Sequence, residues 1–218
     1  NVFENRGLWQ SFTHSSLFSD TSAEKCLINI NERFQHAATF LQRTDYLLIT
    51  FGTAWVFEEE KSGRVVSNCH KLPAAKFNRR RLTVDEITEA YSDLLTKLKA
   101  LYPNLNVVFS VSPIRHWKDG AHENTISKST LLLAVDALQN QFGNVHYFPA
   151  YELLMDELRD YRFYAEDLCH PNCMAINYIW ERFGQAFFDN TTLSIVKECE
   201  DINKALKHRP LHPEDKAY

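Results

Sequence analysis

The chain has 218 residues, with 24 Lys and Arg against 28 Asp and Glu and a formal net charge of -4. This length is sufficient for one well-buried core and no stretch resembles an interdomain linker, so we expect a single domain over 1–218 with a flexible tail at 208–218. Hydrophobic residues at 44% and charged residues at 24% are typical of a water-soluble globular protein. The acidic balance gives no reason to expect nucleic acid as a partner, because nucleic-acid-binding surfaces carry an excess of Lys and Arg.

The five cysteines are irregularly spaced, at Cys26, Cys69, Cys169, Cys173 and Cys199. An odd and irregular set is not typical of the disulfide framework of a small secreted protein, so a reducing, cytoplasmic location is expected. No apolar run has the length that crosses a bilayer, and we therefore expect no membrane partner. The chain does not begin with Met, and we expect it to continue upstream.

A helix is expected over about 22–42, because Thr21 and Glu24 have capping-box spacing and apolar residues then recur at helical period. The apolar residues of this helix are Leu27, Ile30, Phe34, Ala37, Ala38 and Leu41. Residues 46–51 form a continuous apolar run that ends at Gly52. Such a run is typical of a parallel strand covered on both faces.

Residues 55–57 and 65–69 flank a turn signal at 62–63, which predicts a β-hairpin or an excursion from the sheet. The following basic run, Arg79 to Arg81, is expected to be a solvated loop before a helix, with an anion or acidic-partner site as the alternative. That helix begins at Thr83, which has Glu86 at capping-box spacing. Its expected buried stripe is Ile87, Tyr91, Leu94, Leu98 and Leu101.

The second half of the chain continues the alternation of strands and helices. Strands are expected at 106–111 and 145–148, with a helix over about 127–142 between them. Asn172 can cap a further helix, in which Ile176, Ile179, Trp180, Phe183 and Phe187 would face the core, and a last helix is expected over about 191–207. This alternation predicts an α/β fold with a parallel sheet and helices on both faces.

Reactive groups in open parallel sheets gather on loops at the carboxyl ends of the strands. Three segments stand out here, at 52–55, 112–116 and 167–171. In the last of them, Asp167 and His170 are three residues apart on a non-helical segment. This spacing lets the carboxylate accept from imidazole Nδ1 and leaves Nε2 available as a general base.

The chain resembles the SGNH hydrolase superfamily and, within it, the GSCFA family. The segments that carry the resemblance are 49–56 (ITFGTAWV), 68–71 (NCHK), 111–116 (VSPIRH), 161–167 (YRFYAED) and 170–171 (HP). The resemblance implies a flavodoxin-like, three-layer α/β/α fold with a parallel sheet. It also implies a serine nucleophile after the first strand, with His170 as its base and Asp167 as the orienting carboxylate. The implied reaction is hydrolysis of a small-molecule or carbohydrate ester, with no metal or organic cofactor.

Two features of the sequence depart from that family pattern. The Gly-Ser-Cys-Phe-Ala segment is absent, so the first strand and helix, with the serine, are expected upstream of Asn1. In addition, Ala54 stands where SGNH enzymes place an Asn that donates to the oxyanion. The substitute donors that we consider are the backbone N–H of Gly52 or Thr53, the Thr53 hydroxyl, the Trp55 indole and the Asn68 amide.

Other assignments stay open at this point. Arg115 and His116 are candidates for binding a substrate carboxylate or phosphate, and His70 is similarly placed. Ser112 is the best serine within the chain, but it precedes a proline rather than a helix. Zinc is the main rival for the Cys and His residues, although paired Cys-x-x-Cys knuckles are missing. A catalytically silent binding module and an O-acyltransferase remain the alternative functions.

Overall fold

The computed structural model describes residues 2–207 and divides into two compact units, Asn1–Glu152 and Leu153–Tyr218, which we describe separately. The tail expected at 208–218 lies outside the described residues. In the first unit the strands are β1 (Phe3–Asn5), β2 (Leu8–Gln10), β3 (Tyr46–Phe51), β4 (Trp55–Glu59), β5 (Val65–Val66), β6 (Phe77–Arg81), β7 (Asn106–Val111) and β8 (Val145–Phe148). Its helices are α1 (Ala23–Leu41), α2 (Val84–Leu101), α3 (Gly120–Gln141) and α4 (Ala150–Glu152). Short 3-10 turns are η1 (Ser16–Phe18), η2 (Ala74–Lys76) and η3 (Trp117–Asp119).

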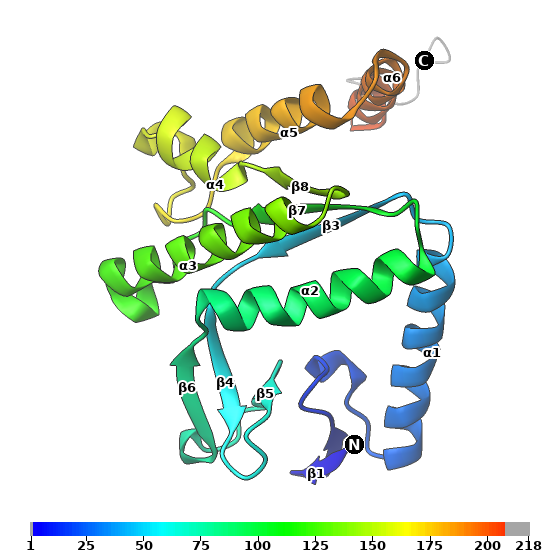
Figure 1. Cartoon of the computed structure of the whole chain (residues 1–218), viewed down its shortest axis with the longest axis vertical. Helices are drawn as coiled ribbons and strands as arrows, with labels where there is room; N and C mark the ends of the chain where they lie inside the picture. Colours follow the sequence, from blue (N-terminus) through cyan, green and yellow to red (C-terminus); the bar gives the residue numbers. More distant parts are fainter. Residues whose placement is uncertain (1, 208–218) are drawn as a thin grey trace, which may run out of the picture. The chain divides into compact units, whose positions relative to one another are not determined.

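The first unit is built on a three-stranded parallel sheet in the order β3-β7-β8. Helices α2 and α3 pack against each other along one face of this sheet (Figure 1). The expected α/β fold is confirmed, because a parallel sheet combined with helices is consistent with a three-layer α/β/α arrangement. In the described residues β3 is an edge strand, and Tyr46 and Leu48 on one of its faces are exposed. The expectation that 46–51 is covered on both faces is therefore wrong.

The core of the first unit lies between the sheet and these two helices. Phe109 and Val107 of β7 are buried against Leu95 of α2 and against Val135 and Leu138 of α3. The capping box at the start of α2 is present, with the Thr83 hydroxyl accepting from the Glu86 N–H. Leu95 is buried where Leu94 was expected, and Leu94 and Leu101 are exposed. The buried face of α2 therefore runs through Ile87, Tyr91 and Leu95, and Leu95 packs against β7.

A second, antiparallel sheet has the order β5-β4-β6. The hairpin of β4 and β5 is confirmed, but the basic run is strand β6 rather than a loop, which corrects the sequence-based expectation. Arg79 pairs with Asp119, Arg80 with Glu58 and Glu86, and Arg81 with Glu123. Pairing with β4 and these acidic partners offset the low strand propensity of the run.

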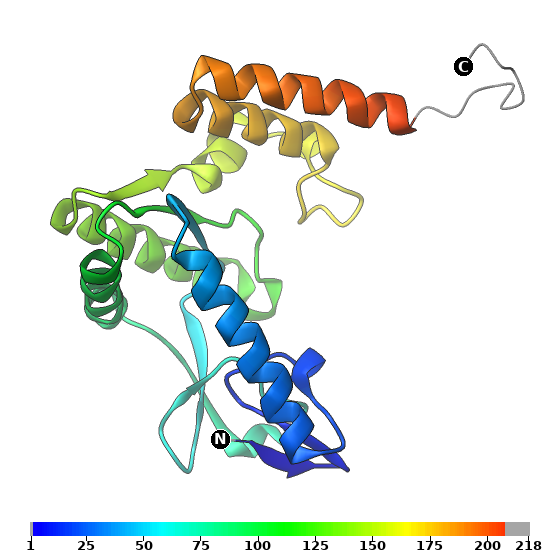
Figure 2. The ribbon, with the colours of Figure 1, turned by 90° about the vertical axis from the view of Figure 1, so that its right-hand side faces the viewer.

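Helix α1 lies beside the N-terminal hairpin of β1 and β2 (Figure 2). Ser22 rather than Thr21 caps it, by accepting from the Lys25 N–H. Only Cys26 of this helix is buried, and Leu27 and Phe34 are exposed, so its predicted buried face is not buried here. Helix α3 begins at Gly120, seven residues before the start expected from the sequence.

The second unit contains the π-helical turn η4 (Leu153–Glu157), the 3-10 turn η5 (Tyr161–Phe163), and the helices α5 (Cys173–Phe187) and α6 (Asn190–Lys207). Its small core joins Leu154, Leu158 and Ala175. The cap expected for α5 is confirmed, because the Asn172 side chain accepts from the Ala175 N–H. Ile176 and Trp180, expected to face the core, are exposed. None of the helices within 2–207 is long and apolar enough to cross a membrane.

Candidate active site

Asp167 and His170 form a hydrogen-bonded pair in the second unit. Asp167 Oδ2 lies 2.5 Å from His170 Nδ1, which is the pairing that the three-residue spacing predicts. The other carboxylate oxygen, Oδ1, accepts from the backbone N–H groups of Cys169 and His170, each at 2.9 Å. The carboxylate thus orients the imidazole while its own position is fixed by two main-chain bonds.

The loop that carries this pair is short and held at both ends. The Ala165 N–H donates to the His170 carbonyl at 2.8 Å, and Tyr164 and Pro171 form an isolated β-bridge. Leu168, between the two functional residues, has a φ of 54°, in the left-handed region that is costly for a β-carbon-bearing residue. The bonds to Asp167 stabilise this tight turn, and about half of each functional side chain is exposed to solvent.

The electrostatics of the loop favour an ionised Asp167. The backbone N–H groups of His170 and Cys169, followed by the His170 side chain, hold the pKa of the Asp167 carboxyl at about 2, below its ordinary value of 3.8. The carboxylate is therefore charged throughout the neutral range. It can stabilise the imidazolium that forms when His170 accepts a proton.

The depressed pKa of Asp167 predicts a local acid transition. Because its folded-state pKa is lowered, ionised Asp167 stabilises the loop at pH values above about 4, and this contribution is lost as the pH falls from about 4 to about 2. We expect a carboxyl ¹³C titration with its midpoint near pH 2 that is absent in Asp167→Asn. A midpoint near pH 4 would show that the two main-chain bonds do not form in solution.

The loops that follow β3 and β7 meet at the carboxyl edge of the parallel sheet in the first unit. A β-carbon placed on Gly52 would lie 3.8 Å from His116 Nε2. Lys128 of α3 joins the same two loops, because its ammonium donates to the carbonyls of Gly52 at 2.6 Å and Ser112 at 2.5 Å. The His116 N–H donates to the Asn124 side chain of α3 at 2.9 Å.

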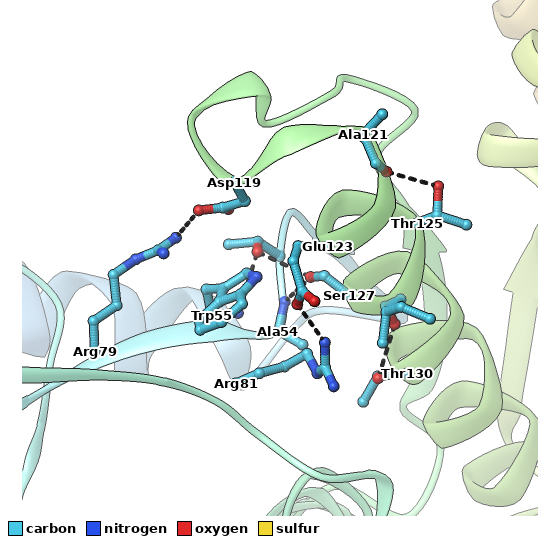
Figure 3. A network of polar contacts seen from close by, with 12 residues as sticks. Ala54, Trp55, Arg79, Arg81, Asp119, Ala121, Glu123, Thr125, Ser127 and Thr130 are labelled. Carbon is cyan, nitrogen blue, oxygen red and sulfur yellow. Dashed lines mark hydrogen bonds and ion pairs between the residues drawn. The ribbon is translucent and has the colours of Figure 1, made fainter.

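Ser127 of the same helix binds the next two residues of this loop, Thr53 and Ala54, and Figure 3 shows Ser127 beside Ala54. The Thr53 hydroxyl lies 3.0 Å from the Ser127 hydroxyl and accepts from the Trp55 N–H, while the Ala54 N–H donates to Ser127 at 2.8 Å. The guanidinium of Arg79 stacks on the Trp55 ring at 4.4 Å. The Trp55 indole N–H is buried without a hydrogen-bond partner in the described residues. Because this nitrogen is buried, a ligand oxygen could bond to it only after the surrounding side chains move.

Asn68 and His70 lie in a tight turn beside the N-terminal hairpin. The Asn68 amide donates to Ser16 Oγ at 3.2 Å, and its oxygen accepts from the His70 N–H at 2.8 Å. His70 is buried, with Nε2 2.7 Å from the Ser11 carbonyl. The bond to Ser16 uses one of the two N–H donors of the Asn68 amide, so the amide keeps a second donor while it holds this turn.

The structure gathers Gly52, Thr53, Trp55 and His116 around the first half of α3. Arg115 lies on the same loop as His116, with its guanidinium 5.7 Å from the Trp117 ring. Asp167 and His170 form a group of their own in the second unit. The sequence analysis missed Asn124, Ser127 and Lys128, which hold the strand-end loops. Their spacing along one helix face is a signal in the sequence, but the helix expected over about 127–142 leaves Asn124 outside it, whereas α3 begins at Gly120.

The rival zinc assignment requires several ligands to meet. Among residues 2–207 no group of three or more His, Cys, Asp or Glu side chains is arranged to hold a metal ion. All five cysteines are free thiols, with Cys169 buried and Cys173 exposed beside the loop of His170. The grouping of Asp167, Cys169, His170 and Cys173 along the sequence therefore does not produce a metal site in the structure.

Comparisons with known proteins identify the family. Neither a search of curated proteins nor a search of solved structures found a match. A protein-family model, that of the GSCFA family, matches residues 1–183. This match covers most of the chain, including the strand-end loops and the Asp167–His170 pair, and it ends before α6. The chain belongs to the GSCFA family.

Proposed function

We propose that this protein is an SGNH-type serine esterase in which His170 is the general base and Asp167 the residue that orients it. The observation that carries the proposal is the hydrogen bond of 2.5 Å between Asp167 and His170 Nδ1, within the region that matches the family. With Nδ1 engaged, Nε2 is the nitrogen that accepts a proton from the nucleophile. The substrate is a small-molecule or carbohydrate ester, and neither nucleic acid nor a membrane is a partner.

The nucleophile in this proposal is a serine on a segment that precedes Asn1. Within residues 2–207 β3 pairs with β7 alone, which supports the proposal because an additional parallel strand can pair along its other edge. The exposed side chains of Tyr46 and Leu48 on one face of β3 would then be covered by the helix that follows the added strand. A serine at the carboxyl end of that strand would lie at the same edge of the sheet as Gly52 and Ser112.

The reaction proceeds through an acyl-enzyme. His170 Nε2 removes the proton from the serine hydroxyl as the oxygen attacks the ester carbonyl, and the resulting imidazolium is stabilised by Asp167. The tetrahedral oxyanion requires hydrogen-bond donors, and the backbone N–H groups of Gly52 and Thr53 are the candidates in this proposal. His170 then donates its proton to the leaving alcohol. In the second half of the cycle it activates a water molecule that releases the acid.

A catalytically silent binding module is the second candidate function. Ala54 is fully buried and its methyl group cannot donate to an oxyanion, which favours this alternative. An O-acyltransferase would use the same residues but transfer the acyl group to a sugar hydroxyl rather than to water. The five free thiols support a reducing compartment, and we place the protein in the cytoplasm.

The test compares the 218-residue chain with the protein encoded by its whole open reading frame, using p-nitrophenyl acetate with and without EDTA. The whole protein is expected to hydrolyse the ester equally well in both conditions, and the 218-residue chain is expected to be inactive. Equal turnover by the shorter chain would instead point to Ser112 or a cysteine. Loss of activity with EDTA would point to a metal-dependent reaction.

A further inference from the structure

One face of α3 carries three polar residues that are almost completely buried. Asn124, Ser127 and Lys128 expose only 5%, 2% and 1% of their surfaces. Their spacing of i, i+3 and i+4 places them on the same side of the helix, toward the carboxyl ends of β3 and β7. A buried polar group destabilises a protein unless it is hydrogen-bonded, so the partners of these three residues show what they do.

Each of the three binds the main chain of a strand-end loop rather than another side chain alone. Asn124 accepts from the His116 N–H, and Ser127 accepts from the Ala54 N–H. Lys128 donates to the carbonyls of Gly52 and Ser112, which follow β3 and β7 directly. Lys128 therefore connects two loops that are about 60 residues apart in sequence, with one ammonium group.

Burial of a lysine side chain at this position lowers the stability of the fold unless its ammonium group is hydrogen-bonded. Taking an ammonium group out of water is unfavourable, and the bonds to the Gly52 and Ser112 carbonyls offset part of that cost. An apolar side chain would fill the space but would leave the Gly52 and Ser112 carbonyls without their donor. The ammonium also polarises the Gly52 carbonyl and, through the same peptide group, the N–H of Thr53. That N–H is one of the donors assigned above to the oxyanion.

We infer that Lys128 is a positioning residue that locks the loops after β3 and β7 into one fixed edge and orients the peptide N–H of Thr53 for an anionic oxygen. Its catalytic consequence rests on the proposed esterase function. Ser127 assists by fixing the next peptide group, at Ala54, and Asn124 by fixing His116.

The experiment measures peptide-level amide hydrogen exchange and ester hydrolysis in the protein encoded by the whole reading frame. Lys128→Met removes the ammonium and keeps the chain length, and Lys128→Arg keeps a donor. Ser127→Ala serves as a second variant in case Lys128→Met does not fold. Thr130→Val is the matched control, because the Thr130 hydroxyl bonds within α3, to the Ile126 carbonyl, rather than to a strand-end loop described here.

In Lys128→Met, exchange is expected to be at least about tenfold faster in both 52–55 and 112–116, with α2 and β8 unchanged. Ser127→Ala should affect 53–55 alone, and Thr130→Val neither segment. The kcat of Lys128→Met should fall about 100-fold with little change in KM, the size of effect expected for one oxyanion donor, and Lys128→Arg should recover part of it.

Uniform acceleration across the protein would overturn the inference, because Lys128 would then add only global stability. Unchanged exchange in the two loops would overturn it as well. Faster exchange confined to the two loops, together with an unchanged kcat, would overturn the catalytic effect inferred for Lys128. If the unmodified protein hydrolyses no ester while the loops loosen locally, the positioning role stands and the proposed esterase function fails.

Discussion

Replacing His170 with Ala is expected to lower the kcat for ester hydrolysis by roughly 10⁴-fold or more in the protein encoded by the whole reading frame. Without the imidazole, no group accepts the proton of the attacking hydroxyl. The hydrogen bond of 2.5 Å between His170 Nδ1 and Asp167 is also lost. Steady-state hydrolysis of p-nitrophenyl acetate measures the effect. Residual activity would come from the oxyanion donors and from substrate binding alone.

The matched control for this substitution is His36→Ala, because His36 is an exposed histidine on α1. It should retain full activity, and both variants should have the unfolding transition of the unmodified protein. A kcat within tenfold of the unmodified protein in His170→Ala would exclude His170 as the general base.

Phe109→Ala is expected to lower the free energy of unfolding by about 3–5 kcal/mol. Phe109 is completely buried in β7, and its ring packs against Phe51 at 5.2 Å and against Tyr91 at 5.6 Å between centroids. Truncation leaves a cavity between the sheet and α2, in addition to the lost burial of the ring. Urea unfolding monitored by circular dichroism measures the change.

Phe34→Ala is the control with the same chemical change. Phe34 lies on α1 with 70% of its surface exposed, so little burial is lost and the expected effect is below about 0.5 kcal/mol. If both substitutions destabilised the protein equally, α1 would be covered in solution and the core described here would be incomplete.

The parallel sheet was predictable because its strands are short apolar runs bounded by turn residues. The expected ranges 46–51, 106–111 and 145–148 coincide with β3, β7 and β8. Local caps were predictable for a similar reason, as at Thr83 and Asn172, since a cap depends on residues within one turn of the helix.

Burial was less predictable than secondary structure, because it depends on partners that are distant in sequence. Phe34 has the helical spacing of a core residue but is exposed in α1. The run Arg79 to Arg81 forms a strand because β4 pairs with it and because four acidic residues from other segments bind its guanidinium groups. Neither outcome can be read from a local pattern.

The same difference between local and long-range contacts applies to the candidate site. Asp167 and His170 are three residues apart, so their pairing depends on one loop and was predicted from the sequence. Lys128 is a charged residue within a helix, and a pattern of this kind normally indicates a solvent-exposed face. Only the packing of α3 against two strand-end loops shows that it is buried.

The most direct test of the account is covalent labelling of the protein encoded by the whole reading frame with a fluorophosphonate, followed by intact mass spectrometry and peptide mapping. The account predicts one adduct per chain, on a serine that precedes Asn1, and a loss of labelling in His170→Ala. Labelling of a residue within the 218-residue chain, or labelling that does not depend on His170, would contradict it.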